Sequence, residues 1–335
     1  MEEETMGSRI FLTGGSGFLG CYVMKALLER GDYVVNYDIR PPGPEYQWLV
    51  GEKLKEASFE RGGIEDLSVM LLAMQKQRVE KIVHAGAIVD PRLLLDHPIL
   101  AYRINLGGTM NVLESARILG ISKVVFISSN GVCTAKRYEP MDEEHPVLLP
   151  NEGGGNGPYS IAKIAGEAFG MNYGDTFGLD FVSLRPSAVY GFGMQYPMYL
   201  KPMVENSVRK LATRFETGRD FPRDYTHVKD VASAVMKALD VSKGFLKDRI
   251  FLIATGTKLV TPGEIARIVQ DFIPDADIEV GAGLTEWNKR EIKYRGLINI
   301  GRAREQLGYD PQYDIRKGIE EYIQLYRSYI GMKKD

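Results

Sequence analysis

The chain has 335 residues, of which 44% are hydrophobic and 26% charged, proportions that suit a soluble α/β protein with a sizeable core and two lobes. Its net charge of −2 gives no general attraction to nucleic acid or to an anionic membrane surface. The two cysteines, Cys21 and Cys133, are too few for a secreted disulfide framework and are not spaced for a metal, so we expect a reduced compartment and no metal centre. The acidic start and the lack of an apolar run near 18 residues predict a cytoplasmic protein without a membrane segment.

The first motif joins a strand to a helix through glycines. Residues 9–12 form a short apolar run, the glycine-rich sequence 13–20 follows at once, and a helical pattern comes next. Gly14, Gly17 and Gly20 lack the Cβ atoms that would keep the backbone away from a pyrophosphate, whose charge then meets the N-terminal amides of the helix. The order of strand, glycine turn and helix therefore predicts a dinucleotide site.

A second apolar strand, residues 33–37, ends at Asp38. A carboxylate at this place accepts hydrogen bonds from both hydroxyls of the adenosine ribose and repels a 2′-phosphate, which favours NAD over NADP. Arg40 weakens this preference. A turn residue ahead of the proline-rich break at 41–44 is the alternative role for Asp38.

Further strand-like runs alternate with helical ones through the rest of the chain. Residues 81–84, 123–127 and 250–253 are apolar and short, and a long helix is expected over 99–119. Near residue 261 a Thr-Pro-Gly-Glu sequence predicts the start of a later helix. This alternation is typical of a parallel sheet covered by helices.

Tyr159 and Lys163, spaced Tyr-x-x-x-Lys, share one face of a predicted helix. A phenol is a poor base at neutral pH, but a neighbouring cation stabilises the phenolate and makes a general acid/base of it. The same spacing also occurs on ordinary solvated helix faces. A glycine cluster at 153–157 comes just before the pair and is either a loop beside an active site or a plain connector.

Several motifs in this order resemble the extended short-chain dehydrogenase/reductase family, in particular its NAD-dependent epimerase/dehydratase branch. The segments that carry the resemblance are residues 13–20, 84–87, 104–109, 128–129, 159–163, 185–191 and 223–232. The fold that it implies is α/β, a Rossmann-type doubly wound parallel sheet with a smaller C-terminal substrate lobe. The expected dinucleotide-binding domain is 7–191, completed by about 231–256, and the expected substrate lobe is 192–230 with 257–335. A homodimer through the helices that contain Met110 and Ala168 is also implied.

The resemblance implies hydride transfer between a secondary alcohol carbon and the nicotinamide of NAD, with three catalytic residues. Tyr159 takes the hydroxyl proton, Lys163 holds the nicotinamide ribose and lowers the pKa of Tyr159, and Ser129 hydrogen-bonds the reacting oxygen. The implied cofactor contacts are Gly14, Gly17, Phe18, Leu19, Asp38, Asp66, Ala85, Gly86, Ala87, Asn105, Ser128, Tyr159, Lys163, Pro186 and Val189. The implied substrate contacts are Ser129, Asn130, Tyr190 and Arg223.

Plainer roles stay open for some of these residues. The serines at 128–129 also fit hydroxyl caps of a strand end, and Asn105 also fits a structural residue within a helix. Arg223 grips a substrate phosphate or pairs with Asp224 or Asp230.

Two positions depart from the family pattern. Ala188 stands where nucleotide-sugar epimerases commonly place an asparagine that contacts the diphosphate, which weakens a nucleotide-sugar substrate. Gly63 stands where the family often has an acid for the adenine edge, so that Asp66 is the nearer match. The stretch 190–199, rich in Met and Tyr, lines a substrate pocket or simply packs.

The hypothesis favoured by Arg223 and its neighbours is an NAD-dependent epimerase/dehydratase-type enzyme. It would oxidise a secondary alcohol of a sugar or sugar nucleotide, a small-molecule substrate, with Tyr159 as general base. The alternative is a net NAD-dependent dehydrogenase of a non-nucleotide sugar, sugar acid or hydroxy acid, which Ala188 favours. A cofactor-binding scaffold without turnover is opposed by the intact set of Ser129, Tyr159 and Lys163.

Overall fold

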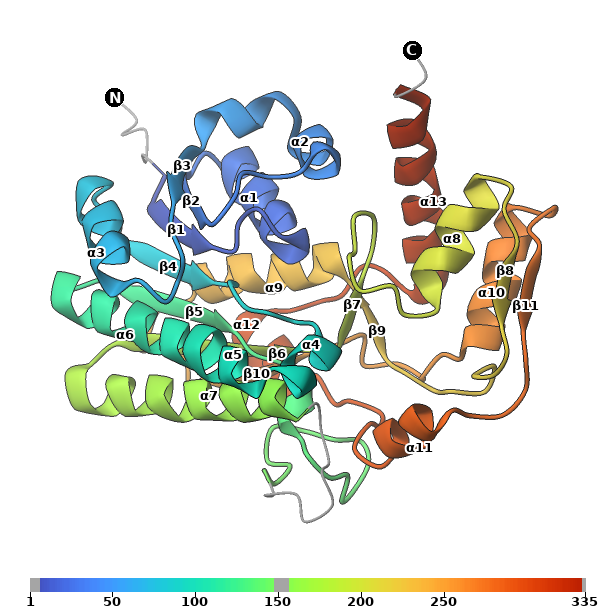
Figure 1. The fold of residues 1–335 in the computed structure, drawn as a ribbon. Coiled ribbons are helices and arrows are strands. Elements are labelled where there is room, and N and C mark those ends of the chain that lie inside the picture. Colours follow the sequence, from blue (N-terminus) through green and yellow to red (C-terminus); the bar gives the residue numbers. More distant parts are fainter. Residues whose placement is uncertain (1–6, 148–156, 333–335) are drawn as a thin grey trace.

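The computed structural model describes residues 7–147 and 157–332, so the acidic start of the chain and residues 153–156 of the glycine cluster lie outside the described residues. A seven-stranded parallel sheet forms its centre, in the order β10-β6-β5-β4-β1-β2-β3 (Figure 1). The strands are β1 (Arg9–Thr13), β2 (Tyr33–Asp38), β3 (Ser58–Arg61), β4 (Lys81–His84), β5 (Lys123–Ile127), β6 (Asp180–Pro186) and β10 (Ile250–Ile253). The predicted doubly wound sheet is confirmed, and its strand order reverses between β1 and β4, where such sheets bind ligands.

Helices cover both faces of the sheet (Figure 1). On one face α1 (Phe18–Arg30) packs against α9 (Val228–Asp240), with α12 (Gly301–Leu307) beside α9 and β10. The other face carries α3 (Leu67–Lys76), α6 (Gly107–Leu119) and α7 (Pro158–Phe177). Because both faces are covered, the central strands read as nearly continuous apolar runs, and every residue of β5 and β6 is buried.

The long helix expected over 99–119 is interrupted. The structure has α4 (Pro91–Asp96), α5 (Pro98–Leu100), a π-helical turn η2 (Ala101–Leu106) and only then α6. Within η2 the Asn105 side chain leaves the helix to bond the backbone of Ile88, with Nδ2 donating to its carbonyl at 2.9 Å and Oδ1 accepting from its N–H at 2.8 Å. A π-helical turn of this kind often marks a functional site.

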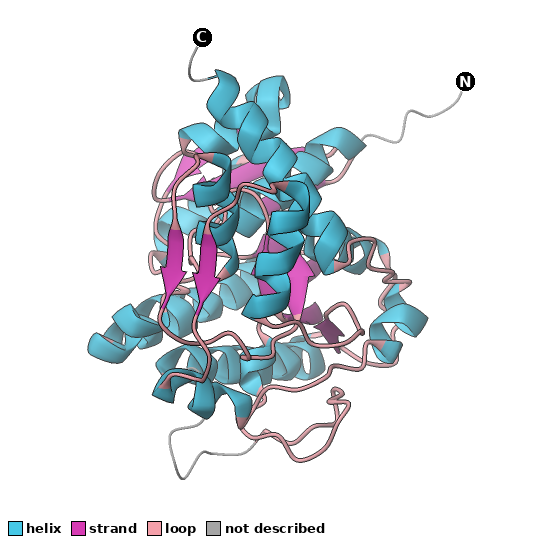
Figure 2. Ribbon diagram, turned by 90° about the vertical axis from the view of Figure 1, so that its right-hand side faces the viewer, coloured by secondary structure: helices cyan, strands magenta, loops and turns pink. Residues whose placement is uncertain are grey.

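The smaller lobe lies beyond the C-terminal edge of the sheet, on the right of Figure 1, and Figure 2 faces it. Its elements are α8 (Leu200–Val208), β8 (Thr213–Phe215), α10 (Pro262–Phe272), β11 (Ile278–Val280), α11 (Glu286–Ile292) and α13 (Ile315–Met332). The predicted helix start is confirmed, because Thr261 and Glu264 form a capping box at the beginning of α10. A short parallel pair, β7 (Ala188–Tyr190) and β9 (Tyr225–His227), crosses between the lobes.

The remaining short elements follow β2 and β5. They are α2 (Pro44–Val50), η1 (Gly51–Glu56) and η3 (Asn130–Val132). Among residues 7–147 and 157–332, no helix is long and apolar enough to cross a membrane.

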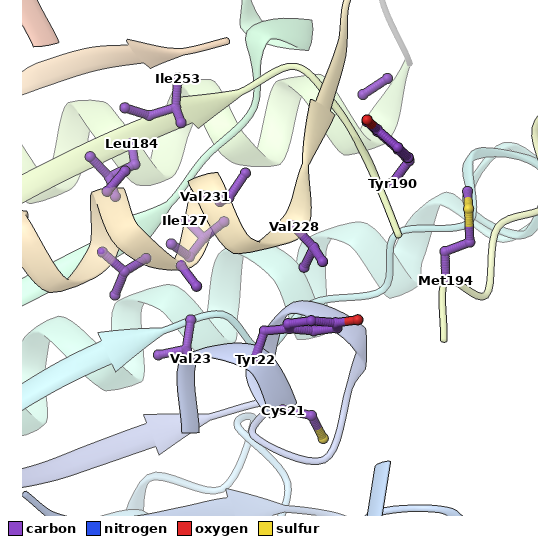
Figure 3. Close-up of a cluster of buried hydrophobic side chains, with 14 of the residues drawn as sticks. Cys21, Tyr22, Val23, Ile127, Leu184, Tyr190, Met194, Val228, Val231 and Ile253 are labelled. Carbon is purple, nitrogen blue, oxygen red and sulfur yellow. The ribbon is translucent and has the colours of Figure 1, made fainter. Parts of the chain in front are cut away.

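One hydrophobic cluster runs from the sheet into the segment after β7. Figure 3 shows its members on α1, β5, β6, α9 and β10 together with Tyr190 and Met194. Hydrogen bonds reinforce the contact, since the Tyr22 hydroxyl donates to the Phe192 carbonyl at 3.0 Å and the Tyr46 hydroxyl to the Gly193 carbonyl at 2.7 Å. The loop after β7 is therefore anchored in the hydrophobic core beside α1 and α2.

Two glycines of α13 offer a test of this packing. A Cβ at Gly318 would stand 1.9 Å from the hydroxyl oxygen of the buried Tyr190, whereas one at Gly331 meets nothing within 4 Å. We expect Gly318→Ala to lower the free energy of unfolding by about 1–3 kcal/mol, because the Tyr190 ring must move in a packed core. Gly331→Ala should raise it by at most about 1 kcal/mol. Urea unfolding of both variants measures the difference, and equal effects would contradict the packing described.

Candidate active site

A cavity of about 570 Å³ opens where the strands of the sheet end and the smaller lobe begins. Most of the predicted cofactor and substrate contacts line it: Gly14, Gly17, Phe18, Leu19, Asp38, Ala85, Gly86, Ala87, Ser128, Ser129, Asn130, Tyr159, Lys163, Pro186, Val189 and Arg223. They come from the ends of β1, β2, β4, β5 and β6, from α1, α7 and β7, and from the segment before β9. The fold thus brings together segments that are far apart in the sequence.

The glycine turn between β1 and α1 leaves no room for side chains. Gly14 has φ of +70°, and a Cβ there would lie 2.7 Å from the backbone of Gly86. A Cβ at Gly20 would lie 2.0 Å from the Gly14 carbonyl oxygen. The N-cap of α1 is Gly17, which offers no side-chain cap, and no acid stands in the first turn. The first amides of α1 are thus left for an anionic ligand, and this turn fits a pyrophosphate.

Asp38 ends β2 inside the cavity. Its carboxylate accepts hydrogen bonds from the backbone N–H of Ser16 at 3.2 Å and of Arg40 at 3.4 Å. Burial raises the pKa of Asp38, and these N–H donors offset part of that rise. Arg40 also lines the cavity. The end of β2 therefore places a carboxylate in the cavity, with the cation of Arg40 two residues away.

An Asp38→Asn variant tests this arrangement. We expect its dissociation constant for NAD to rise about 10- to 100-fold, because charge-assisted hydrogen bonds to the ribose are lost. Its dissociation constant for NADP should fall relative to the wild type, because the carboxylate no longer repels a 2′-phosphate and Arg40 remains. Titration calorimetry with both coenzymes measures the change. Glu45→Gln, outside the cavity lining, is the matched control and should alter neither constant.

Ser129, Tyr159 and Lys163 meet at one wall of the cavity. Ser129 hydrogen-bonds the Tyr159 hydroxyl, and Tyr159 is half-buried. The Lys163 ammonium donates to the Ile127 carbonyl at 2.6 Å and lies 4.6 Å from the Phe126 ring centroid. The second turn of α7 and the end of β5 are therefore held together through the lysine.

The expected lowering of the Tyr159 pKa by Lys163 is wrong for the protein alone. Burial raises the pKa of Tyr159 to about 12, and the hydrogen bond from Ser129 offsets only part of this. The Lys163 nitrogen is 5.8 Å from the Tyr159 ring centroid, and burial lowers the pKa of Lys163 to about 7. In this structure burial therefore outweighs the lysine in setting the pKa of Tyr159.

Behind Lys163, α7 is tied to β6 by a buried ion pair. The Arg185 guanidinium donates to both oxygens of Glu167, at 2.9 and 2.7 Å, and the Ser183 hydroxyl donates to the same carboxylate at 2.9 Å. Both charged side chains are about 5% exposed or less. Because Glu167 is one turn after Lys163, this pair fixes the rotation of α7 that points Tyr159 and Lys163 into the cavity.

His84 is part of the framework and has no free nitrogen for chemistry. Its Nδ1 lies 2.7 Å from the Thr13 hydroxyl, and its Nε2 lies 3.0 Å from the Thr109 hydroxyl, which itself donates to the Asn105 carbonyl. Burial, helped by the charge of Lys163, lowers the pKa of His84 to about 3. The neutral ring thus links β1, β4 and α6 under the cavity. No group of three or more potential metal ligands occurs among the residues that the structure describes.

Asp66, Asn105 and Tyr190 lie outside the cavity lining of the described chain, unlike the other predicted contacts. Asp66 caps α3, accepting from the Val69 N–H at 3.1 Å, and its neighbour Glu65 lines the cavity instead. The Asn105 amide forms two hydrogen bonds with the backbone of Ile88, which fits the structural role that the sequence left open for it. The buried Tyr190 donates to the Asp314 carbonyl at 3.3 Å. These three side chains therefore bond the backbone of neighbouring segments instead of lining the cavity.

Arg223 stands at the junction of two cavities. The second, also about 570 Å³, is walled mainly by aromatic and polar side chains of the smaller lobe. Those side chains are Tyr199, Phe215, Phe221, Thr285, Trp287, Asn288 and Glu291. The residues that line both cavities are Val89, Gln195, Tyr196, Met198 and Arg223. The stretch 190–199 therefore both packs, through Tyr190, and lines the pocket, through Met194 to Met198.

The ionic partner of Arg223 is neither Asp224 nor Asp230. Arg223 lies 3.7 Å from Glu291, which also receives Arg295 at 3.0 Å. The Asp224 carboxylate instead accepts from the hydroxyls of Ser187, Thr226 and Thr255. Arg295 also lines the first cavity. The sequence does not predict it, because no local pattern marks an arginine so far along the chain from Arg223. Ser16 and Gln195 line the same cavity and were missed as well.

Comparison with known proteins shows the family of the chain. The model of the NAD dependent epimerase/dehydratase family matches residues 10–254. A putative UDP-glucose 4-epimerase of Methanocaldococcus jannaschii is 29% identical, covering 94% of this chain and 97% of that protein. The UDP-glucose 4-epimerase of Mycolicibacterium smegmatis is also 29% identical, covering 96% and 99%.

Among solved structures, the crystal structure of the Thermus thermophilus UDP-glucose 4-epimerase in complex with NAD matches with a TM-score of 0.79 and 26% identity, covering 95% of this chain and 99% of that one. The family match over residues 10–254 spans the central sheet from β1 to β10. The chain therefore belongs to the NAD-dependent epimerase/dehydratase family of extended short-chain dehydrogenases/reductases, and its cofactor is NAD.

Proposed function

We propose that the protein interconverts two C4 epimers of a nucleoside diphosphate sugar and keeps its NAD throughout the cycle. The observation that carries the proposal is the pair of connected cavities with Arg223 at their junction. The first cavity is lined by Ser129, Tyr159 and Lys163 and by the glycine turn between β1 and α1. The second cavity has aromatic walls that suit a nucleoside. The relatives named UDP-glucose 4-epimerase support the same substrate class.

The chain's own residues fit NAD in three places. The turn with Gly14, Gly17 and Gly20 would hold the pyrophosphate, Asp38 the adenosine ribose and Lys163 the nicotinamide ribose. When bound, NAD supplies the acceptor and donor of hydride. The glycines and Asp38 therefore orient the coenzyme, while the proton chemistry falls to the protein.

Tyr159 moves the proton. As a phenolate, Tyr159 would take the proton of the sugar C4 hydroxyl in the first half of the cycle, and as the resulting phenol it would return that proton to the same oxygen in the second half. The Ser129 hydroxyl, which bonds Tyr159 in this structure, would turn its single O–H toward that oxygen as it becomes a carbonyl. Overall redox is then zero, which distinguishes this reaction from net dehydrogenation.

Ala188 does not stand against a nucleotide substrate. It lines the first cavity, but Arg223 and Arg295 already provide cations for a diphosphate where the two cavities meet. Net dehydrogenation of a small free sugar or acid would leave the second cavity without a role. The epimerase hypothesis is therefore favoured over its alternative.

The lobes, the assembly and the compartment are also proposed. The dinucleotide domain is 7–191 with about 231–256, and the substrate lobe is 192–230 with 257–335. The packing of α9 against α1 and the pairing of β10 with β6 support this division.

A homodimer through α6 and α7 is supported by their exposed apolar side chains Ile118, Ile161, Phe169 and Phe177. Light scattering tests it, since a monomeric mass rules it out. A cytoplasmic location is consistent with the free, buried Cys21 and Cys133.

Coenzyme retention and product analysis test the proposal together. We expect the purified protein to release near-stoichiometric NAD on denaturation and to interconvert UDP-glucose and UDP-galactose without net change in absorbance at 340 nm. Steady NADH formation with a free sugar or hydroxy acid, and no epimer from a UDP-sugar, would overturn the proposal in favour of a net dehydrogenase.

A further inference from the structure

A buried asparagine lies under the glycine turn between β1 and α1. Asn36 belongs to β2, is 1% exposed, and has the fully buried neighbours Val35 and Tyr37. Asparagine is depleted in strands, and burying an amide costs free energy unless its donors and its acceptor are hydrogen-bonded. Polar residues that break the apolar pattern of a buried strand are expected at functional sites, so Asn36 is a candidate for a role in the neighbouring coenzyme site.

The Asn36 amide uses one of its two polar atoms on this turn. Its Nδ2 donates to the Ser16 hydroxyl oxygen at 3.0 Å, inside the protein. Its Oδ1 is buried and has no hydrogen-bond partner among the described residues. Since the desolvation of an unpaired carbonyl offsets the gain from a single hydrogen bond, Asn36 adds little to the stability of the sheet.

Asn36 also lies directly against the backbone of the turn. A Cβ at Gly15 would overlap the Asn36 side-chain oxygen, so the turn closes tightly on this amide. The Cys21 thiol donates to the Gly15 carbonyl at 3.2 Å and holds the turn from α1. The amide therefore supports the turn from below, at both Gly15 and Ser16.

Ser16 connects Asn36 to Asp38. The Ser16 hydroxyl accepts from Asn36, and the Ser16 N–H donates to the Asp38 carboxylate at 3.2 Å. Between these two residues, the Tyr37 carbonyl accepts from the Gly14 N–H at 3.0 Å. Three consecutive residues at the end of β2 thus hold the turn, and Ser16 is held at both its side chain and its backbone.

The Asp38 carboxylate depends on this arrangement. Burial raises the pKa of Asp38, and the Ser16 N–H makes the largest opposing contribution. Ser16 and Asp38 both line the cavity, whereas Asn36 lies outside the lining of the described chain. Any effect of Asn36 on a bound coenzyme therefore passes through its neighbours, first of all through Ser16.

We propose that Asn36 is a positioning residue of the NAD site. Its amide fixes Ser16, the N–H of Ser16 fixes the Asp38 carboxylate, and the carboxylate binds the hydroxyls of the adenosine ribose. The buried amide thus serves coenzyme affinity and not the stability of the sheet. This role rests on the proposed contact between Asp38 and the ribose, and it is independent of the sugar that the enzyme converts.

A double-mutant cycle on the NAD-loaded enzyme tests this role, with the exchange of bound NAD against isotope-labelled NAD as the measurement. We expect Asn36→Val to raise the dissociation rate of NAD about 5- to 10-fold, because the carboxylate is held less firmly. In the Asp38→Asn background the same change should raise it less than about twofold, since the charged partner is already absent. An equal effect in both backgrounds, or none in the wild type, would overturn the inference. If Asp38→Asn alone left the rate unchanged, the proposed ribose contact itself would fall.

Urea unfolding separates this role from a structural one. Valine is apolar and β-branched, so Asn36→Val removes the unpaired oxygen without weakening the strand. The urea midpoint of the variant, measured after removal of NAD, should equal or exceed that of the wild type. A lower midpoint would trace the faster loss of NAD to a weakened fold and would overturn the inference.

Two further variants complete the experiment. Ser16→Ala removes the same hydrogen bond from the other side and keeps the N–H that bonds Asp38, so its NAD dissociation rate should lie within about threefold of that of Asn36→Val. A larger rise would show that the Ser16 hydroxyl contacts the coenzyme directly, and no rise would show that its bond to Asn36 has no effect; either result would contradict the proposed role. Ser115→Ala is the matched control, because it removes a buried hydroxyl on α6 that has no hydrogen-bond partner among the described residues and lies away from the cavity. It should leave the dissociation rate of NAD unaffected.

Discussion

Replacing Tyr159 by phenylalanine should lower kcat for epimerisation about 10³-fold while leaving NAD bound. The phenol lies at the wall of the cavity, where Ser129 bonds it, and it is the group proposed above to take the proton of the sugar. General acid/base catalysis by a positioned side chain contributes about 10²- to 10⁴-fold, and the phenyl ring keeps the shape of the wall. The rate is measured with the UDP-sugar that the wild type epimerises, and the bound NAD is measured after denaturation.

Tyr173→Phe is the matched control on the same helix. Tyr173 lies on α7 away from the cavity, and its hydroxyl donates to Glu114 at 3.0 Å. Its loss should change kcat less than twofold. Turnover of Tyr159→Phe within tenfold of the wild type would show that another group moves the proton, and the mechanism proposed above would be wrong.

Replacing the buried Glu167 by glutamine should lower the free energy of unfolding more than any other substitution proposed for this protein. Glu167→Gln removes the only carboxylate hydrogen-bonded to the Arg185 guanidinium among the described residues, in a place where its Nη1 already has no hydrogen-bond partner in the described chain. Removing one member of a buried ion pair costs about 3–5 kcal/mol, because the remaining charge is desolvated and uncompensated. We expect a loss of this size in the free energy of unfolding, measured by urea denaturation.

An exposed ion pair provides the comparison for Glu167. Glu114 accepts Arg117 at 2.6 Å, three residues away on the surface of α6. Glu114→Gln should cost no more than about 1 kcal/mol, since solvent screens the pair. A Glu167→Gln variant as stable as Glu114→Gln would contradict the claim that the pair fixes α7 against β6.

Because Glu167 is one turn beyond Lys163, its variant also tests the site. A small rotation of α7 moves Tyr159 relative to the coenzyme turn, and misplacements near 1 Å cost about 10²-fold in rate. We therefore expect kcat of folded Glu167→Gln to fall at temperatures where the protein is still native by circular dichroism.

The sequence by itself determined the coenzyme half of this protein. Strand, glycine turn and helix follow one another without a break, Asp38 ends the next strand, and Tyr159 and Lys163 are four residues apart. Each of these signals is local, so that spacing alone determines which side chains share a face or a turn. The sheet and most of the cavity lining followed from them.

Only the tertiary structure decided what depends on distant contacts. Burial raises the pKa of Tyr159, the Asn105 amide bonds the backbone of Ile88, and Asp66 caps α3. The cluster of Arg223, Glu291 and Arg295 joins residues far apart in the chain, and no periodic pattern in the sequence predicts it. Desolvation and pairing are properties of the packed chain, because they depend on which atoms exclude water from one another, and a linear pattern does not contain that information.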